Sequence, residues 1–304
     1  MSLPQTEAIN AASHGLDTCA PEDALRRLLH GQSQALDTVS QAIPQIAEAA
    51  RLLADTLRNG GRLVTAAAGS SALMGMADAA ELPGTFGIAA DRILILPAGG
   101  FLQDAHMPGG SEDDAEDGRR AARQIAATDA VLALSASGRT AYTCALATEA
   151  RARGARLIAI ANAPDTPLLQ GADVAICLPT PPELIAGSTR MGAGTTQKVA
   201  LNMMSTLMAI HLGHVFDGNM VNLRADNTKL RERASRMVAD IAGVSPETAR
   251  TALDTADGEV KAAILLASGA GDLGAAQALL AQTDGHLRPA LLRLDQHTTN
   301  GRET

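Results

Sequence analysis

The segment Ala130-Val131-Leu132-Ala133-Leu134-Ser135-Ala136-Ser137-Gly138-Arg139-Thr140 decides the fold. It starts as a short apolar run, ends in a loop of small and hydroxyl residues, and leads into a helical pattern that extends to Arg153. Apolar runs without alternation are typical of strands that are covered on both faces of a parallel sheet. The segment therefore predicts a strand, a polar loop and a helix in direct succession.

Further apolar runs have the same character, and the first of them leads into a second loop of this kind, Gly69-Ser70-Ser71. These runs predict strands at 62–67, 92–97, 156–162 and 173–178, with a helix after the first loop to about Glu81. Strands that are separated by helices indicate a parallel sheet. The predicted fold class is α/β, a three-layer doubly wound parallel sheet with N-terminal helices and a small all-α C-terminal domain.

Both flanks of the sheet region are expected to be helical. Before it, apolar residues recur at helical spacing from Leu36 to Leu57, and Pro44 is expected to kink or split this helix. The stripe fits packing on the sheet or the seam of a hairpin or dimer, and the sequence leaves both open. After about Asn227, short helices are predicted at 234–242, 246–253, 259–268 and 273–282. The predicted division is an N-terminal segment at 1–58, a sheet domain at 59–226, a helical domain at 227–290 and a flexible tail at 291–304.

The composition excludes several classes of partner. The 304-residue chain has 25 Lys and Arg against 33 Asp and Glu, a formal net charge of −8, and only 1% aromatic residues. A chain of this kind is not expected to bind nucleic acid or an anionic membrane. Three widely spaced cysteines fit no zinc or redox motif, and the N-terminus has no signal-peptide pattern. We therefore expect a cytoplasmic protein with reduced thiols.

The two serine-rich loops are the candidate binding elements. Each lies at the carboxyl end of a predicted strand, where ligands of parallel α/β sheets bind. The N–H groups at a helix start are unpaired and favour an anion, and hydroxyls add donors. The alternative is that the serines are helix N-caps. Neither loop has a nucleotide-binding motif, so the pattern predicts a phosphate held by Gly69, Ser70, Ser71, Ser137, Gly138, Arg139 and Thr140.

Three glutamates are candidates for the chemistry. Glu81 precedes Leu82-Pro83, where burial would raise its pKa and make it a base at neutral pH, and a surface position is the equal alternative. Glu112 lies in an acidic run that the residues alone interpret as a solvated helix start. Glu183 precedes Ser188-Thr189-Arg190 and a further helix, as at the edge of a site. No calcium or zinc spacing is present, so no metal site is expected.

Taken together, the motifs resemble the N-acetylmuramic acid 6-phosphate etherases of the sugar isomerase (SIS) domain superfamily. The run at 135–140 resembles the phosphate loop of the superfamily, and Asp78-Ala79-Ala80-Glu81-Leu82-Pro83 resembles an etherase motif. Further matches lie at 6–17, 61–71, 110–113, 183–198 and 227–230, and the last helices resemble the small ubiquitin-associated-like domain of that family. The eukaryotic glucokinase regulatory protein is a more distant relative. The resemblance implies a flavodoxin-like SIS fold.

The resemblance also implies a reaction, the cleavage of the C3 lactyl ether of N-acetylmuramic acid 6-phosphate in peptidoglycan recycling. The products would be N-acetylglucosamine 6-phosphate and D-lactate. Glu81 would take the C2 proton and protonate lactate, and Glu112 would be the second acid/base. Glu183 and the segment Ser188-Thr189-Arg190 would border the sugar, with Glu183 also a weaker candidate for ring opening. No cofactor is implied, and the expected partners are the sugar phosphate and a second copy of the chain.

Some residues depart from the family pattern. Ala67 and Ala72 stand where the family has Gly, Leu73 stands where it has Arg, and Gly192 stands where many members have Lys. The loss of two cations weakens the attraction for a substrate that carries a phosphate and a carboxylate. Two alternatives therefore remain beside the etherase, an isomerase of another sugar phosphate and a non-catalytic sensor.

Overall fold

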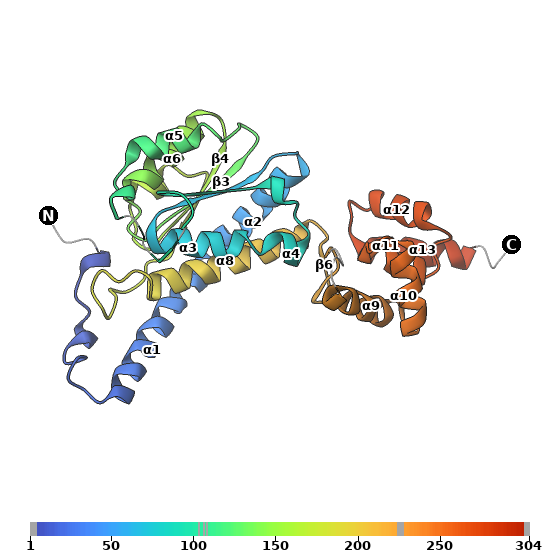
Figure 1. Ribbon diagram of the computed structural model, residues 1–304, viewed down its shortest axis with the longest axis horizontal. Helices are drawn as coiled ribbons and strands as arrows, with labels where there is room; N and C mark the ends of the chain where they lie inside the picture. Colours follow the sequence, from blue (N-terminus) through green and yellow to red (C-terminus); the bar gives the residue numbers. More distant parts are fainter. Residues whose placement is uncertain (1–4, 103, 106, 108, 224–227, 301–304) are drawn as a thin grey trace. The chain divides into compact units, whose positions relative to one another are not determined.

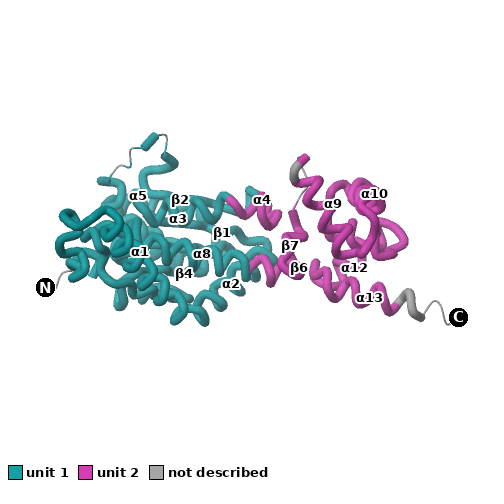
Figure 2. The backbone as a smooth tube through the Cα atoms, turned by 90° about the horizontal axis from the view of Figure 1, so that it is seen from below, with its two compact units in different colours: residues 1–80, 90–207 teal, residues 81–89, 208–304 magenta. Residues whose placement is uncertain are grey.

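A computed structural model describes residues 5–102, 104, 105, 107, 109–223 and 228–300 of the chain. Asn227, in the last of the family motifs, lies outside the described residues. The chain forms two compact units, residues 1–80 with 90–207 and residues 81–89 with 208–304 (Figure 2).

The first unit is built on a five-stranded parallel sheet, whose strands β3 and β4 are labelled in Figure 1. The strand order is β2-β1-β3-β4-β5. Every residue of β1 and β3 is buried, which is expected for central strands with helices on both faces. The doubly wound α/β prediction is confirmed. The strands are β1 (Leu63–Ala67), β2 (Ile93–Pro97), β3 (Ala130–Ser135), β4 (Arg156–Ala161) and β5 (Val174–Cys177).

Helices cover both faces of this sheet (Figure 1). One face packs against α5 (Ala115–Ala122), α6 (Ala141–Ala152) and α7 (Pro167–Gln170), in a hydrophobic core that includes Val131 and Leu146. The opposite face carries α3 (Gly69–Ala79), where a Cβ at Gly75 would collide with Thr65. α8 (Gly192–His211) runs beside α3 (Figure 1), and α2 (Ile43–Arg58) contacts β1, β3 and β5.

The N-terminal helical region is divided, as Pro44 predicts. α1 (Pro21–Asp37) is followed by the 3-10 turn η3 (Thr38–Ala42), and α2 begins with Pro44 in its first turn, where proline is tolerated. Within α2, the apolar stripe is buried at Ile46 and Leu53, so this part packs on the sheet. In the single chain, Leu36 and Ile43 are 37% and 49% exposed.

The second unit is helical and has its own core, which includes Val238, Ile264 and Leu265. A short hairpin, β6 (Val215–Phe216) and β7 (Asn219–Met220), was not predicted. Its turn residues Asp217 and Gly218 have φ of +43° and +76°, which is typical of an Asp-Gly hairpin turn. The helices are α4 (Leu82–Phe86), α9 (Thr228–Ala242), α10 (Pro246–Thr255), α11 (Val260–Ala267), α12 (Leu273–Ala281) and α13 (Leu287–Asn300).

The C-terminal segment differs from the tail that the sequence predicts at 291–304. Residues 291–300 continue α13, because Leu294 is buried in the core of this unit and Leu291 packs against it. The remaining domain boundaries stay predictions, and the compact units place 81–89 and 208–226 with the C-terminal helices. None of the described helices has the length and hydropathy that a membrane crossing requires.

Candidate functional site

The two serine-rich loops follow neighbouring strands. β1 and β3 pair in parallel with Ala67 opposite Leu134, so the chain leaves both strands at the same edge of the sheet. β1 also pairs with β2 on its other side, and the strand order therefore changes direction between β1 and β3. Such a switch point is where open α/β sheets bind their ligands.

The first loop turns directly into a helix. Gly69 begins α3 with φ of +54°, a left-handed conformation that favours glycine. The residue before it is Ala68, whose side chain cannot accept a hydrogen bond from the helix. Ser70 is half-buried and Ser71 is buried, both inside the first turn. The N-cap alternative therefore does not hold for this loop, because its serines follow the cap position.

The second loop is held together by its own hydroxyls. The Ser135 Oγ accepts a hydrogen bond from the Gly138 N–H over 3.0 Å and lies 2.7 Å from the Thr140 Oγ1. The Ser137 Oγ accepts from the Arg139 N–H over 3.2 Å. A Cβ at Gly138, where φ is +64°, would collide with Thr166. Thr140 occupies the cap position of α6 without a side-chain cap bond.

Glu112 contacts the first loop and the helix that follows the second loop. Its carboxylate lies against Gly69, where an added Cβ would collide with the Glu112 Oε1. Its backbone carbonyl accepts a hydrogen bond from the Tyr142 N–H, in the first turn of α6, over 3.0 Å. The residue therefore stands between the start of α3 and the start of α6. The sequence alone favoured a solvated helix start for this acidic run, whereas in the structure Glu112 packs against α3 and α6.

The pKa of Glu112 is raised above its ordinary value. Burial is the larger cause, because it disfavours the charged form, and the charge of Asp113 adds to it. A carboxyl with a raised pKa exchanges protons more readily near neutral pH. The raised pKa favours the predicted acid/base role of Glu112, which stays a prediction.

A small pocket of about 20 Å³ opens beside this carboxylate. Its apolar walls include Leu73 and Met76 of α3 and Leu102 of the loop after β2. Leu73 is one of the departures from the family pattern.

The Glu183 carboxylate binds the first amides of α8. The residue is 7% exposed, and its two carboxylate oxygens accept hydrogen bonds from the Gly192 and Ala193 N–H groups over 3.0 and 2.9 Å. It therefore closes the N-terminus of α8, where a negative charge is favoured. The predicted role of Glu183 at the border of the sugar stays a prediction.

The segment Ser188-Thr189-Arg190 leads into the same helix. The Thr189 carbonyl accepts from the Gly194 N–H over 2.8 Å, Ser188 and Thr189 are half-buried, and Arg190 is exposed. The N-terminal motif lies alongside, since the Gly187 N–H donates to the Thr6 carbonyl over 3.2 Å. The motif that begins at Thr6 and the motif at 183–198 are therefore in contact, although they are far apart in the sequence.

Glu81 belongs to the second unit, at the start of α4, and its side chain is exposed. The sequence left open whether Glu81 is buried or at the surface, and in the single chain it is at the surface. Ala80 and Glu81 form a turn between α3 and α4, although both keep right-handed helical dihedral angles. Its catalytic role stays a prediction.

An ion pair near the end of α3 was not predicted from the sequence. Asp78 is 8% exposed and accepts from Lys198 over 3.1 Å and from Asn202 over 2.8 Å, both on α8. The pair fixes α3 against α8. The available signal was that Asp78 and Lys198 each lie inside a family motif.

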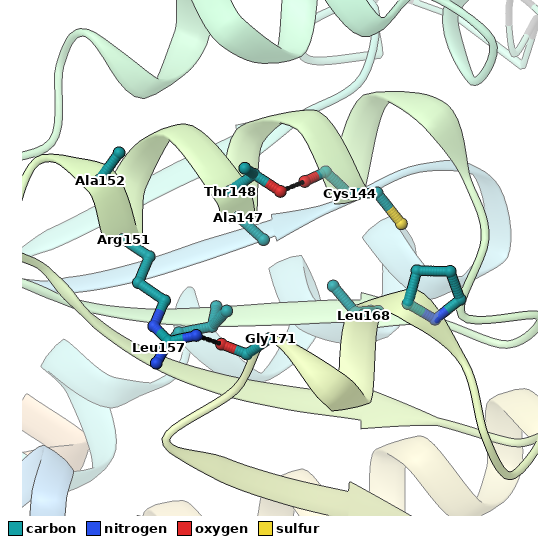
Figure 3. Close-up of a pocket in the computed structure, with 9 residues that line it drawn as sticks. Cys144, Ala147, Thr148, Arg151, Ala152, Leu157, Leu168 and Gly171 are labelled. Atoms are coloured by element: carbon teal, nitrogen blue, oxygen red, sulfur yellow. Dashed lines mark hydrogen bonds between the residues drawn. The ribbon is translucent and has the colours of Figure 1, made fainter.

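A larger pocket of about 330 Å³ lies behind the second loop, between α6, β4 and α7 (Figure 3). The Cys144 thiol donates to the Gly138 carbonyl over 3.6 Å, and burial raises its pKa despite the nearby charge of Arg139. At the other end Arg151 donates to the Gly171 carbonyl over 2.7 Å. None of the site residues predicted from the sequence lines this pocket.

The likeness to known proteins extends over nearly the whole chain. A model of the SIS domain matches residues 111–212. The N-acetylmuramic acid 6-phosphate etherase of Streptomyces avermitilis is 42% identical over 274 residues, 89% of this chain and 88% of its own. The protein of the same name from Deinococcus radiodurans is 39% identical over 290 residues, 94% of this chain and 95% of its own.

Among solved structures, a Bacteroides fragilis protein described as a phosphosugar isomerase involved in capsule formation has a TM-score of 0.50 and 20% identity. The match covers 66% of this chain and 95% of that chain, and at this identity it concerns the fold alone. The named relatives, in contrast, match the chain across both of its compact units. The chain therefore belongs to the N-acetylmuramic acid 6-phosphate etherase family.

Proposed function

We propose that the protein is a carbon–oxygen lyase that cleaves the C3 D-lactyl ether of N-acetylmuramic acid 6-phosphate. The products are N-acetylglucosamine 6-phosphate and D-lactate. The main structural support for the proposal is the position of Glu112. Its carboxylate lies against the first loop, and its backbone carbonyl accepts a hydrogen bond from the first turn of α6. The relatives that share about 40% of their residues with the chain carry the name of this activity.

The phosphate is expected at the switch point. The amides that start α3 and α6, the half-buried Ser70 and the hydroxyls of Ser137 and Thr140 offer donors at the same sheet edge. Arg139 is exposed and supplies a positive charge beside them. These groups fix the C6 end of the sugar and leave C1 to C3 to reach the carboxylates.

The elimination needs an acidic proton at C2. Ring opening exposes C1 as an aldehyde, which acidifies the C2 proton. A carboxylate takes this proton, the electron pair of the C2–H bond forms the C2=C3 double bond, and the C3–O bond breaks. The lactate oxygen leaves with a proton from an acid. We assign the C2 proton and the protonation of lactate to Glu81.

The second half returns water to the sugar. Water adds its oxygen to C3 and a proton to C2 of the conjugated enal, which gives the open form of N-acetylglucosamine 6-phosphate. We assign the activation of this water to Glu112, because a raised pKa suits a carboxyl that alternates between base and acid. The sum of both halves is hydrolysis of the ether with no change in oxidation state.

The decisive experiment incubates the protein with N-acetylmuramic acid 6-phosphate and measures D-lactate with a D-lactate-specific dehydrogenase. In deuterium oxide, the hexosamine product is expected to carry deuterium at C2. An isomerase would keep all carbons in one molecule, and a sensor would bind the sugar phosphate unchanged. Well-folded protein that releases no D-lactate would disprove the etherase.

We also propose that the active protein is a cytoplasmic homodimer. α1 presents Leu25 and Leu29 with 65% and 68% of their surface exposed, which a partner copy would cover. Cys19, Cys144 and Cys177 are free thiols, as expected in a reducing compartment. Light scattering of the parent and of Leu29→Arg tests the dimer, which predicts twice the chain mass for the parent and a smaller species for the variant.

A further inference from the structure

The pocket beside Glu112 has the size of a single small group. Its volume of about 20 Å³ compares with the roughly 10–15 Å³ that one water molecule requires. Its walls are mostly aliphatic, from Leu73 and Met76 of α3, Pro97 at the end of β2, and Leu102. Ser111 and Glu112 are the polar side chains of the described lining. A water needs two to four polar partners, so the aliphatic part of the wall suits a methyl group better than a water.

The pocket is lined by Glu112 and by Gly69 of the first loop, and by none of the second-loop residues 137–140. The Glu112 carbonyl bonds the first turn of α6, while its carboxylate lines the pocket together with Gly69. In a hexosamine 6-phosphate, the phosphate is on C6 and the other substituents are on C2 and C3, at the opposite end. A sugar with its phosphate at the switch point and its C2–C3 bond near Glu112 therefore directs one of these substituents into the pocket.

The two substituents differ in charge. The lactyl group carries its methyl and its carboxylate on the same carbon, so burying that methyl would bring the carboxylate close to Glu112. Glu112 is the one charged residue among the described residues that line the pocket, and two carboxylates repel. The acetamido group is neutral, and its N–H is a donor for a carboxylate oxygen.

We propose that this pocket receives the methyl group of the C2 acetamido substituent, and that Leu73 sets the largest acyl group that fits. The inference rests on the proposed function, because that function places C2 near Glu112. It assigns a specificity-determining role to a side chain that departs from the family pattern.

The test compares N-acetyl and N-propionyl muramic acid 6-phosphate. The parent is expected to prefer the acetyl substrate by roughly tenfold or more in kcat/KM, as one additional methylene does in a filled apolar pocket. Leu73→Ala is expected to reduce this preference by about tenfold, because it makes room for the methylene. Leu102→Ala opens the pocket from its exposed wall without touching α3, and it is expected to shift the preference in the same direction.

Met74→Ala is the matched control. Met74 is the next residue of α3 and is half-buried like Leu73, but it faces Gly194 at the start of α8 and does not line the pocket. It is expected to leave the ratio of acetyl to propionyl turnover unchanged. Melting temperatures of all three variants separate a loss of fold from a change in selectivity.

An unchanged ratio in both pocket variants would overturn the inference. So would a gain by Leu73→Ala for a substrate with an additional methylene on the lactyl chain, because the lactyl methyl would then be the occupant. Calorimetric binding of N-acetyl and N-propionyl glucosamine 6-phosphate repeats the comparison without turnover. A parent that releases no D-lactate but shows the binding preference disproves the etherase and leaves the pocket assignment standing.

Discussion

Gly69→Ala tests whether the contact between the first loop and Glu112 matters for catalysis. Gly69 has φ of +54°, and an added Cβ would collide with the Glu112 Oε1. Left-handed backbone costs a residue with a Cβ about 1–2 kcal/mol. The collision comes in addition, and it moves the carboxylate away from the start of α3.

Gly60→Ala is the matched control for the backbone cost. Gly60 has φ of +85° and no heavy atom within 4 Å of an added Cβ. The left-handed backbone is expected to cost both variants about 1–2 kcal/mol, and the collision adds to this cost only in Gly69→Ala. Each kcal/mol lowers the melting temperature by roughly 2–4 °C in a domain of this size. Gly69→Ala alone is expected to lose kcat, by about a hundredfold, because a displaced catalytic group costs that much.

The assay measures D-lactate release and thermal unfolding of both variants in parallel. Gly69→Ala with the parent kcat/KM would refute the reasoning, since the carboxylate would then work equally well from a displaced position. Equal losses of activity in both variants would also refute it, because backbone strain alone would then explain the effect.

Three further substitutions test single groups. Glu112→Gln removes a carboxyl whose pKa is raised by burial and by Asp113. Between the ordinary pKa of a glutamate and the raised pKa of Glu112, the folded parent binds more protons than the unfolded chain. The stability of the parent therefore falls as the pH rises through this range. This fall is expected to be absent from the melting curves of the variant. Glu183→Ala removes two hydrogen bonds from the start of α8, and we expect chemical denaturation to show a loss of about 1–3 kcal/mol; an unchanged midpoint would contradict the capping role. Glu81→Gln is expected to abolish lactate release while the melting temperature stays within about 1 °C, because the side chain is exposed; normal turnover would exclude Glu81 as the base.

The strands could be predicted because they are fully buried. Residues 130–135 are uninterruptedly apolar up to Ser135, and the structure forms β3 over the same residues. The hairpin at Asp217-Gly218 was missed because its strands have two residues each, too few for an apolar pattern. The predicted tail at 291–304 was wrong for 291–300, because a polar helix with two anchoring leucines does not differ in composition from a solvated segment.

The sequence by itself determined the fold class and the two loops, because the strand and loop patterns are local and each follows from a few neighbouring residues. It also determined the family, through motifs distributed along the whole chain. The tertiary structure decided which residues meet. Glu112 is 43 positions after Gly69 and 30 before Tyr142 in the numbering, and the parallel pairing of β1 with β3 brings the starts of their helices to one edge of the sheet. From the sequence, Glu112 is one of several acids in a solvated run. Its partial burial and its contacts with the first loop and with α6 depend on the packing of segments that are far apart in the sequence.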